Sequence, residues 1–350
     1  MPALDGVRGV AILLVLAYHF LGAPIGAFLG VDVFFVLSGF LITTLLLQEH
    51  EAGGGISLPG FYRRRALRLL PALFAMLGAY LLIEAANVAL GSADQGALFA
   101  AVRGALAGGF YLSNFLQTWG GGVPAPLEHL WSLAAEEQFY LAWPLLLYGA
   151  LRLGLRTRAL VAATAALVVL AFGHQLVLSL RGASLHRLSF APDVRSASLT
   201  VGCLAGVAFA RGTIPGLLRS TTFQSLGVPI LWTLSLLILL LLPSSSQLRF
   251  YGGTLVFDLT WVLLIVAAVL DQAGPWATML ALRPLVWVGR ISYALYLWNW
   301  LILAALPFGR WPSLPLSFLA AFLSYRYVEQ PFLRRKRRSV APPVPAPVPA

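Results

Sequence analysis

An arginine and a histidine lie on one face of the first apolar segment. Arg8 and His19 stand eleven residues apart in LDGVRGVAILLVLAYH. Eleven steps of about 100° return to within about 20° of the starting direction, three helical turns along the axis. Ionisable groups are costly inside a membrane and usually face a polar cavity, where they bind substrates or relay protons. We therefore expect both to line one cavity. The alternative is a histidine bonded to a backbone carbonyl and an arginine reaching for the membrane surface.

The second apolar segment, GVDVFFVLSGFLITTL, begins with a carboxylate, Asp32. This group could accept the ring N–H of His19 and so orient the imidazole. It could equally cap the start of its own helix. The sequence leaves both roles open.

Polar side chains follow one face at the start of the fourth apolar segment, HLWSLAAEEQFYLAWP. They lie at i, i+3, i+7 and i+11: His129, Ser132, Glu136 and Tyr140. Glu137 points about 100° away from this face. A carboxylate two turns into a span needs a nearby cation, which Arg8 or a protonated His19 could supply. Attraction to the helix dipole would explain Glu128 better than Glu136.

A third polar face occurs in GRISYALYLWNW, where Ser292, Tyr296 and Asn299 lie at i, i+4 and i+7. Three helices with inward polar faces predict a wet or ligand-filled cavity inside a bundle. Trp298 and Trp300 are typical of the aromatic belts at membrane surfaces, so we give them no functional role.

Four arginines cluster before the third apolar segment, in FYRRRALRLLPAL: Arg63, Arg64, Arg65 and Arg68. Guanidinium groups are permanently charged and bind phosphates through two donors at once. The cluster therefore predicts a site for a phosphorylated cosubstrate. Anionic lipid headgroups, or a purely topological role, are the alternatives.

Several other kinds of chemistry lack a signature in this chain. No spacing of metal ligands, no glycine-rich nucleotide loop and no nucleophile elbow occurs. The single cysteine, Cys203, permits no internal disulfide. We expect no metal and no permanently bound cofactor.

The composition is that of an integral membrane protein. Of 350 residues, 59% are hydrophobic and 11% charged, against about 25% charged in soluble domains; mean hydropathy is +0.83. The prediction is an all-α polytopic bundle in the lipid bilayer. Ten segments are long and apolar enough to span: 6–22, 29–47, 66–90, 128–151, 159–180, 197–210, 224–242, 254–270, 285–306 and 313–328.

Basic residues predict the topology. The net charge of +11 comes from arginines at the ends of apolar segments, so we assign it to the positive-inside rule and expect no nucleic-acid partner. With ten spans and both termini cytoplasmic, the three strongest basic runs (63–68, 152–158 and 334–338) all lie inside. Residues 98–117 are then a re-entrant or outer-surface helix. We expect the first span to be retained rather than cleaved as a signal peptide, and residues 334–350 to form a disordered tail after a domain of residues 1–333.

These motifs together resemble acyltransferase family three, multispan bacterial enzymes that O-acylate carbohydrates. The resemblance rests on LDGVRGVAILLVLAYH, GVDVFFVLSGFLIT, FYRRRALRLLP, HLWSLAAEEQFYLAWP, GRISYALYLWNW and YRYVEQPF, in this order over residues 4–332. It implies a multi-pass protein of the plasma (inner) membrane. It also implies transfer of an acyl group, usually acetyl from acetyl-CoA, to a hydroxyl of a carbohydrate or glycolipid.

The resemblance also implies roles for individual residues. Arg8 and His19 match the family's essential pair, Arg63, Arg65 and Arg68 its arginine motif, and Glu136 its motif glutamate. The family pattern usually reads LYLWHWP where this chain has LYLWNWL, so Asn299 replaces a histidine and cannot titrate. No fused extracytoplasmic domain, which some relatives carry, follows the last span, so we expect a single-component transferase.

The resulting hypothesis places acyl-CoA phosphates on the arginines and makes His19 the general base. Asp32 or Glu136 would orient the imidazole, as the third member of a catalytic triad does. We prefer direct transfer, with an acyl-histidine as the alternative. A transporter or flippase of a lipid-linked sugar could use the same cavity without acyl transfer, and a non-catalytic scaffold is the third possibility.

Overall fold

The chain folds into a bundle of α-helices. The computed structural model describes residues 1–53 and 55–338, and this part of the chain contains no β-strand, which confirms the all-α prediction. In chain order the helices are α1 (Pro2–Leu16), α2 (Gly30–Gly53), α3 (Leu58–Ala89), α4 (Gln95–Gly109), α5 (Ser113–Trp119), α6 (Leu130–Arg152), α7 (Thr157–Leu180), α8 (Leu185–Phe190), α9 (Pro192–Ala210), α10 (Val228–Leu241), α11 (Gly253–Leu270), α12 (Pro275–Leu280), α13 (Arg283–Arg290), α14 (Ser292–Ala305), α15 (Arg310–Leu323) and α16 (Gln330–Arg338).

Fewer helices than expected are long and apolar enough to cross a membrane. Seven pass this test within the described residues, and a bent pair raises the number to at most eight, so the prediction of ten spans is not confirmed. The seven are Pro2–Leu21, Ala27–Gly53, Leu58–Ala89, Thr157–Leu180, Pro192–Ala210, Phe223–Leu241 and Gly253–Leu270. The chain is a multi-pass membrane protein. The cytoplasmic placement of both termini stays a prediction.

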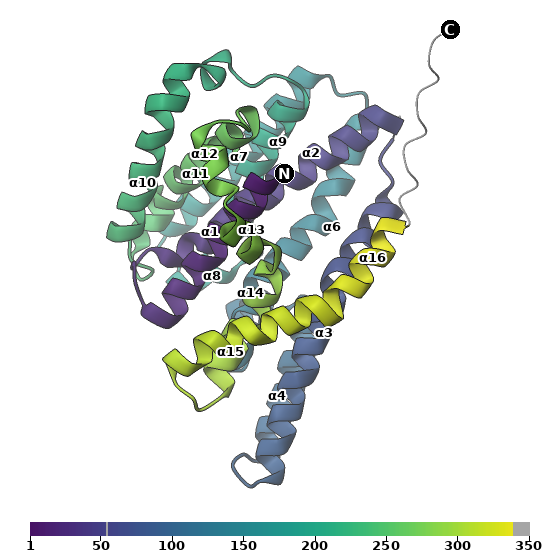
Figure 1. Ribbon diagram of the computed structural model, residues 1–350, viewed down its shortest axis with the longest axis vertical. Helices are drawn as coiled ribbons and strands as arrows, with labels where there is room; N and C mark the ends of the chain where they lie inside the picture. Colours follow the sequence, from purple (N-terminus) through teal and green to yellow (C-terminus); the bar gives the residue numbers. More distant parts are fainter. Residues whose placement is uncertain (54, 339–350) are drawn as a thin grey trace.

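The stretch 98–117, which we expected to be a re-entrant or outer-surface helix, falls within the bent pair of helices α4 and α5. Helices α4 and α5 meet at an angle of 120°, which fits a broken span or a re-entrant loop. In Figure 1 α4 returns along the far half of α3, so the two helices form a hairpin that projects from the bundle. The buried Gly104 of α4 packs against Pro124 and Leu127, and Gly108 packs against Leu130 of α6 and Leu77 of α3, so these small residues seat α4 against its neighbours.

The last two expected spans are not single regular α-helices. The stretch 285–306 breaks at Ile291 between α13 and α14, and α14 has only 14 residues. The stretch 313–328 continues from α15 through a π-helical segment, Ser324–Glu329, into α16. Because α16 runs to Arg338, the expected domain boundary at 333 lies inside a helix; the division into a membrane domain and a tail stays a prediction. Residues 339–350 lie outside the described part.

The bundle has central and peripheral helices. In the most apolar stretches of α2 and α11, 72% and 67% of the residues are buried, against 22% in α7 and 17% in α10. The outer helices therefore present apolar side chains to lipid, while α2 is enclosed by α1, α6, α9 and α11 (Figure 1). Polar side chains on α2 are thus held inside protein.

Glycines bring α2 and α9 into backbone contact. A Cβ added to Gly39 would lie 2.1 Å from the Leu199 carbonyl oxygen, and one added to Gly202 would lie 2.0 Å from the Val36 carbonyl oxygen. Only glycine fits at both positions, as at other membrane helix pairs with small residues at the interface. This contact fixes the register of the two helices and so the relative positions of their polar groups.

Candidate active site

Two cavities lie next to each other inside the bundle. We call the first the Arg8 pocket: it encloses about 240 Å³ among α1, α2, α3, α6 and α14. The second, the His19 pocket, encloses about 470 Å³ where the end of α1 meets the starts of α2 and α6. Both are lined by Val31 and Tyr296, so the two cavities meet there.

The expectation that Arg8 and His19 line one cavity is wrong. Arg8 lines the first pocket and His19 the second. The calculation assumed a uniform α-helix, but α1 ends at Leu16 and continues as a π-helical turn, Ala17–Leu21. A π-turn bonds i to i+5 and advances by less than 100° per residue, so His19 does not keep the direction of Arg8.

The imidazole of His19 is held by an amide. Its Nδ1 lies 2.6 Å from Oδ1 of Asn299. The amide nitrogen of Asn299 donates to the carbonyl oxygens of Leu295 (2.7 Å) and Tyr296 (2.9 Å). Because both amide protons are used, Oδ1 can only accept, and Nδ1 of His19 must carry the proton. This leaves Nε2 unprotonated and without a partner among the described residues, on a side chain that lines the pocket.

Neither carboxylate proposed to orient His19 contacts it. Oδ1 of the buried Asp32 accepts from Arg195 (2.7 Å) and from Ser198 (3.1 Å), both on α9. The close α2–α9 contact directs this carboxylate away from α1. Asp32 is thus part of a buried ion pair and not a partner of the imidazole.

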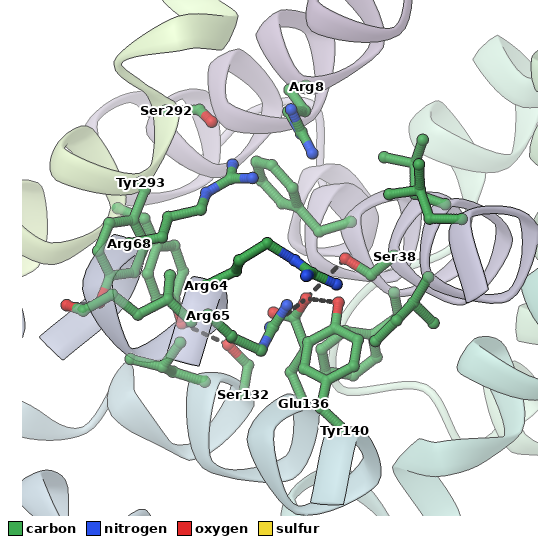
Figure 2. Close-up of a pocket in the computed structure, with 18 of the residues that line it drawn as sticks. Arg8, Ser38, Arg64, Arg65, Arg68, Ser132, Glu136, Tyr140, Ser292 and Tyr293 are labelled. Atoms are coloured by element: carbon green, nitrogen blue, oxygen red, sulfur yellow. Dashed lines mark hydrogen bonds and ion pairs between the residues drawn. The ribbon is translucent and has the colours of Figure 1, made fainter. Parts of the chain in front are cut away.

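Glu136 lies in the Arg8 pocket, away from His19. Its Oε1 accepts from Ser38 (2.6 Å) and from Tyr140 (2.5 Å), and lies 3.8 Å from Nη2 of Arg65. The cation expected beside Glu136 is therefore Arg65, not Arg8 or His19. Figure 2 shows these groups gathered at one side of the pocket.

Arginines surround the same cavity. Arg8 on α1 and Arg64, Arg65 and Arg68 on α3 all point into it (Figure 2). Arg65 makes a bidentate pair with Glu137, with its shortest contact 2.5 Å long. Arg64 pairs with Glu49 (2.9 Å).

Two of these guanidinium groups keep capacity for a ligand. Arg68 has no hydrogen-bond or ion-pair partner among the described residues, and Arg8 contacts only Asp5, at 3.3 Å. Arg63 is exposed and does not line the cavity. It stands two residues from Arg65, and such pairs do not share a helical face. Arg8 and Arg68 are thus the main groups available to an anion, Arg64 keeps only the donors that are not paired with Glu49, and Arg63 is no part of the pocket.

The remaining polar residues lie where the pockets meet. The hydroxyl of Ser132 lies 2.5 Å from that of Tyr296, which also donates to the backbone carbonyl of His129. Ser292 lines the Arg8 pocket and His129 the His19 pocket, so all five predicted cavity residues, Asn299 included, lie at or beside the two cavities. No group of three or more histidine, cysteine or acidic side chains in the described residues is placed to hold a metal ion.

The sequence of the chain matches a family of known proteins over most of its length. The family described as an acyltransferase domain matches residues 1–325. The chain belongs to this acyltransferase family. No solved structure matches it.

Relatives with described activities carry this family sequence within longer chains. A peptidoglycan O-acetyltransferase, OatA, of Listeria monocytogenes is 30% identical over 95% of this chain, and a putative peptidoglycan O-acetyltransferase, YrhL, of Bacillus subtilis is 31% identical over 97%. The O-acetyltransferase OatA of Staphylococcus aureus is 29% identical over 97%. The chain spans just over half the length of these relatives, namely 55%, 56% and 58%.

Sequence analysis missed several residues of this family member's two pockets. Trp300, assigned to an aromatic belt, lies with its ring centroid 4.5 Å from that of His19. Glu137 was placed outside the polar face of α6, yet it is the main partner of Arg65. Arg195 and Arg249 line the His19 pocket, and Ser38 hydrogen-bonds to Glu136. Arg195 lies two residues before the apolar segment 197–210, so its position did not mark it as an intramembrane charge.

Proposed function

We propose that this chain is a membrane O-acyltransferase that moves an acetyl group from acetyl-CoA to a hydroxyl of a carbohydrate. Family membership and relatives named as peptidoglycan O-acetyltransferases support the reaction class. The observation that carries the proposal is the free Nε2 of His19, in a pocket that adjoins a second one lined with arginines.

The donor occupies the Arg8 pocket. Arg68, Arg8 and Arg64 offer charge-assisted, bidentate donors to the CoA phosphates. The pantetheine arm is narrow and uncharged, and it extends past Val31 and Tyr296, the two residues common to both cavities. This route brings the thioester carbonyl to His19 while the phosphates stay at the arginines.

The acceptor hydroxyl is activated in the His19 pocket. Nε2 of His19 takes the proton as the hydroxyl oxygen attacks the thioester carbonyl carbon. The carbon–sulfur bond then breaks, and the imidazolium returns the proton to the CoA thiolate. Asn299 accepts the Nδ1–H throughout, so it fixes the tautomer with Nε2 as the base. A positioned base of this kind contributes about 10²–10⁴ in rate. In the alternative route, Nε2 attacks the thioester carbonyl and the carbon–sulfur bond breaks to give an acetyl-histidine and the CoA thiolate. The acceptor hydroxyl then attacks the acetyl-histidine, the nitrogen–carbon bond breaks, and the hydroxyl proton passes to the released imidazole or the thiolate.

The sidedness follows from the chemistry of the donor. Acyl-CoA is made in the cytosol, so the Arg8 pocket faces the cytosol and the His19 pocket faces the opposite side of the bacterial plasma membrane. With this orientation the N-terminus, at the Arg8 end of α1, is cytoplasmic. The protein would thus carry acyl groups from a cytosolic donor to an extracytoplasmic carbohydrate.

The experiment uses the protein in phosphatidylcholine vesicles with carbon-14 acetyl-CoA outside and a soluble glycan inside. The proposal expects base-labile label on the glycan and one free CoA for each ester formed. Vesicles without protein are the control. If acetyl-CoA stays intact and no label reaches the glycan, the proposal is wrong, and movement of a lipid-linked sugar added to the same vesicles would then identify a transporter.

A further inference from the structure

Two buried arginines line the His19 pocket together with the imidazole. Arg195 comes from the start of α9, and Arg249 from the 3₁₀ segment Gln247–Tyr251 before α11. The two residues are only 6% and 8% exposed, yet both line the cavity. Two buried guanidinium groups in one small cavity need compensating charge or polar partners, because a buried unpaired ion is costly.

Arg195 has a charged partner that does not line the cavity. Its Nη2 donates to Asp32 (2.7 Å), and Asp258 interacts electrostatically with both groups. Asp32 and Asp258 are fully buried and do not line the cavity. The Nε of Arg195 has no hydrogen-bond partner in the described structure.

Arg249 has less. Its Nη2 donates to the hydroxyl of Ser189, and no carboxylate lies within ion-pair distance in the part of the chain described. The guanidinium lies over the rings of Phe28 (5.2 Å) and Phe250 (4.3 Å), and its Nε is buried without a partner. Arg249 is thus a cation fixed in position by a hydroxyl and two aromatic faces, with donors left for a ligand.

The rest of the pocket suits a sugar ring. Trp131 and Trp300 stand among its aromatic side chains, and a volume of about 470 Å³ lies within the usual range for a small-molecule site. The acidic side chain at this pocket, Glu128, is exposed, so solvent screens its charge. The exposed His186 also lies at the rim.

We propose that the His19 pocket binds a carbohydrate carrying an anionic group, a carboxylate or a phosphate, and that Arg249, with Arg195 beside it, holds this group. The inference rests on the proposed function, since it names the class of acceptor. Pairing the anion with Arg249 fixes one end of the sugar, and this sets which hydroxyl meets Nε2 of His19. Arg249 therefore determines both acceptor class and position.

The test measures binding without acetyl-CoA, so a failure of acyl transfer leaves its result unaffected. The protein is placed in phosphatidylcholine nanodiscs, and tryptophan fluorescence reports binding because two tryptophans line the pocket. The probes are N-acetylglucosamine, which is uncharged, N-acetylmuramic acid, which adds a carboxylate to the same ring, and N-acetylglucosamine 1-phosphate. At least one charged sugar should bind at least about 10-fold more tightly than the uncharged one, as expected for a charge-assisted contact.

Variants assign the preference to the arginine. R249Q should abolish it, while R103Q, which changes an exposed arginine on α4, should keep it. If R249Q does not fold, S189A retains the charge but removes the hydroxyl that positions it, and the preference should then fall several-fold. The proposal would be overturned if all three sugars bound equally or if none bound. It would also be overturned if the preference survived in folded R249Q or were unchanged in S189A. Loss of the preference on adding phosphatidylglycerol would overturn it too, because a lipid headgroup would then be the occupant.

Discussion

The amide oxygen of Asn299 lies 2.6 Å from Nδ1 of His19 and selects the tautomer of the imidazole. The amide is itself held by two backbone carbonyls of its own helix, so it cannot turn its nitrogen toward the ring. A neutral acceptor thus does the orienting that the sequence assigned to a carboxylate.

Replacing Asn299 by leucine should slow transfer by about 10-fold in kcat. The lost hydrogen bond is worth about 0.5–1.5 kcal/mol, and 1.36 kcal/mol corresponds to a tenfold change in rate. N299D keeps an oxygen acceptor and should retain more activity than N299L. Both are measured as initial rates of acetyl transfer at saturating donor, and equal rates in N299L and the wild type would remove Asn299 from the site.

Arg68 should be the main contact of the donor phosphates among the arginines of α3. R68A should raise the donor KM by about 10–100-fold, since hydrogen bonds to charged groups contribute about 1.5–3 kcal/mol. R63A is the matched control, because Arg63 stands on the same helix but is exposed and lies outside the pocket. The same rise in both variants would mean that these arginines act only through overall charge.

A bulky side chain at the junction of the two cavities should stop transfer without stopping donor binding. Val31 is one of the two residues common to both pockets. V31W should reduce kcat by at least about 10²-fold, since displacing reacting groups by about 1 Å can cost that much, while V31A keeps the passage open and active. Donor affinity is measured separately by equilibrium binding of labelled CoA. Transfer at the normal rate in folded V31W would show that the thioester takes another path.

The ion pairs of α3 should differ in their contribution to stability. Removing the charge in E137Q leaves Arg65 without its bidentate partner and should destabilise the protein by about 3 kcal/mol, as for other buried pairs. E49Q breaks a pair whose side chains are each 30% exposed and should cost less than about 1 kcal/mol. The Tm in detergent should therefore fall much further in E137Q. Equal Tm values would show that the Arg65 pair does not stabilise the helix packing.

Helical periodicity identified the residues of the site more reliably than their partners. The polar faces of α6 and α14 meet as expected, at the Ser132–Tyr296 contact. Arg8 and His19 were separated because the α-helix becomes a π-helix at Ala17, and no residue pattern in LVLAYHFL indicates such a turn. A local change of helical twist cannot be obtained from apolar spacing alone.

Which side chains pair across different helices depends on how the helices pack, and this packing could not be predicted from a single sequence. Asp32 binds Arg195 because glycines let α2 and α9 touch, and α9 lies about 160 residues further along the chain. The number of ten spans is not confirmed for a related reason: apolar stretches such as 285–306 were counted whole, although they break inside the bundle. Hydropathy does not separate these cases, because helices buried in protein and helices facing lipid are made of the same apolar residue types.

Acetyl transfer by H19A in reconstituted vesicles tests the central claim most directly. The two-pocket account predicts that kcat falls by about 10²–10⁴-fold while the donor KM changes less than about twofold, because His19 lies outside the Arg8 pocket. The amount of folded, inserted protein is matched to the wild type beforehand. Transfer at the wild-type rate by H19A would contradict the account, and so would a variant whose loss of activity is restored at high acetyl-CoA.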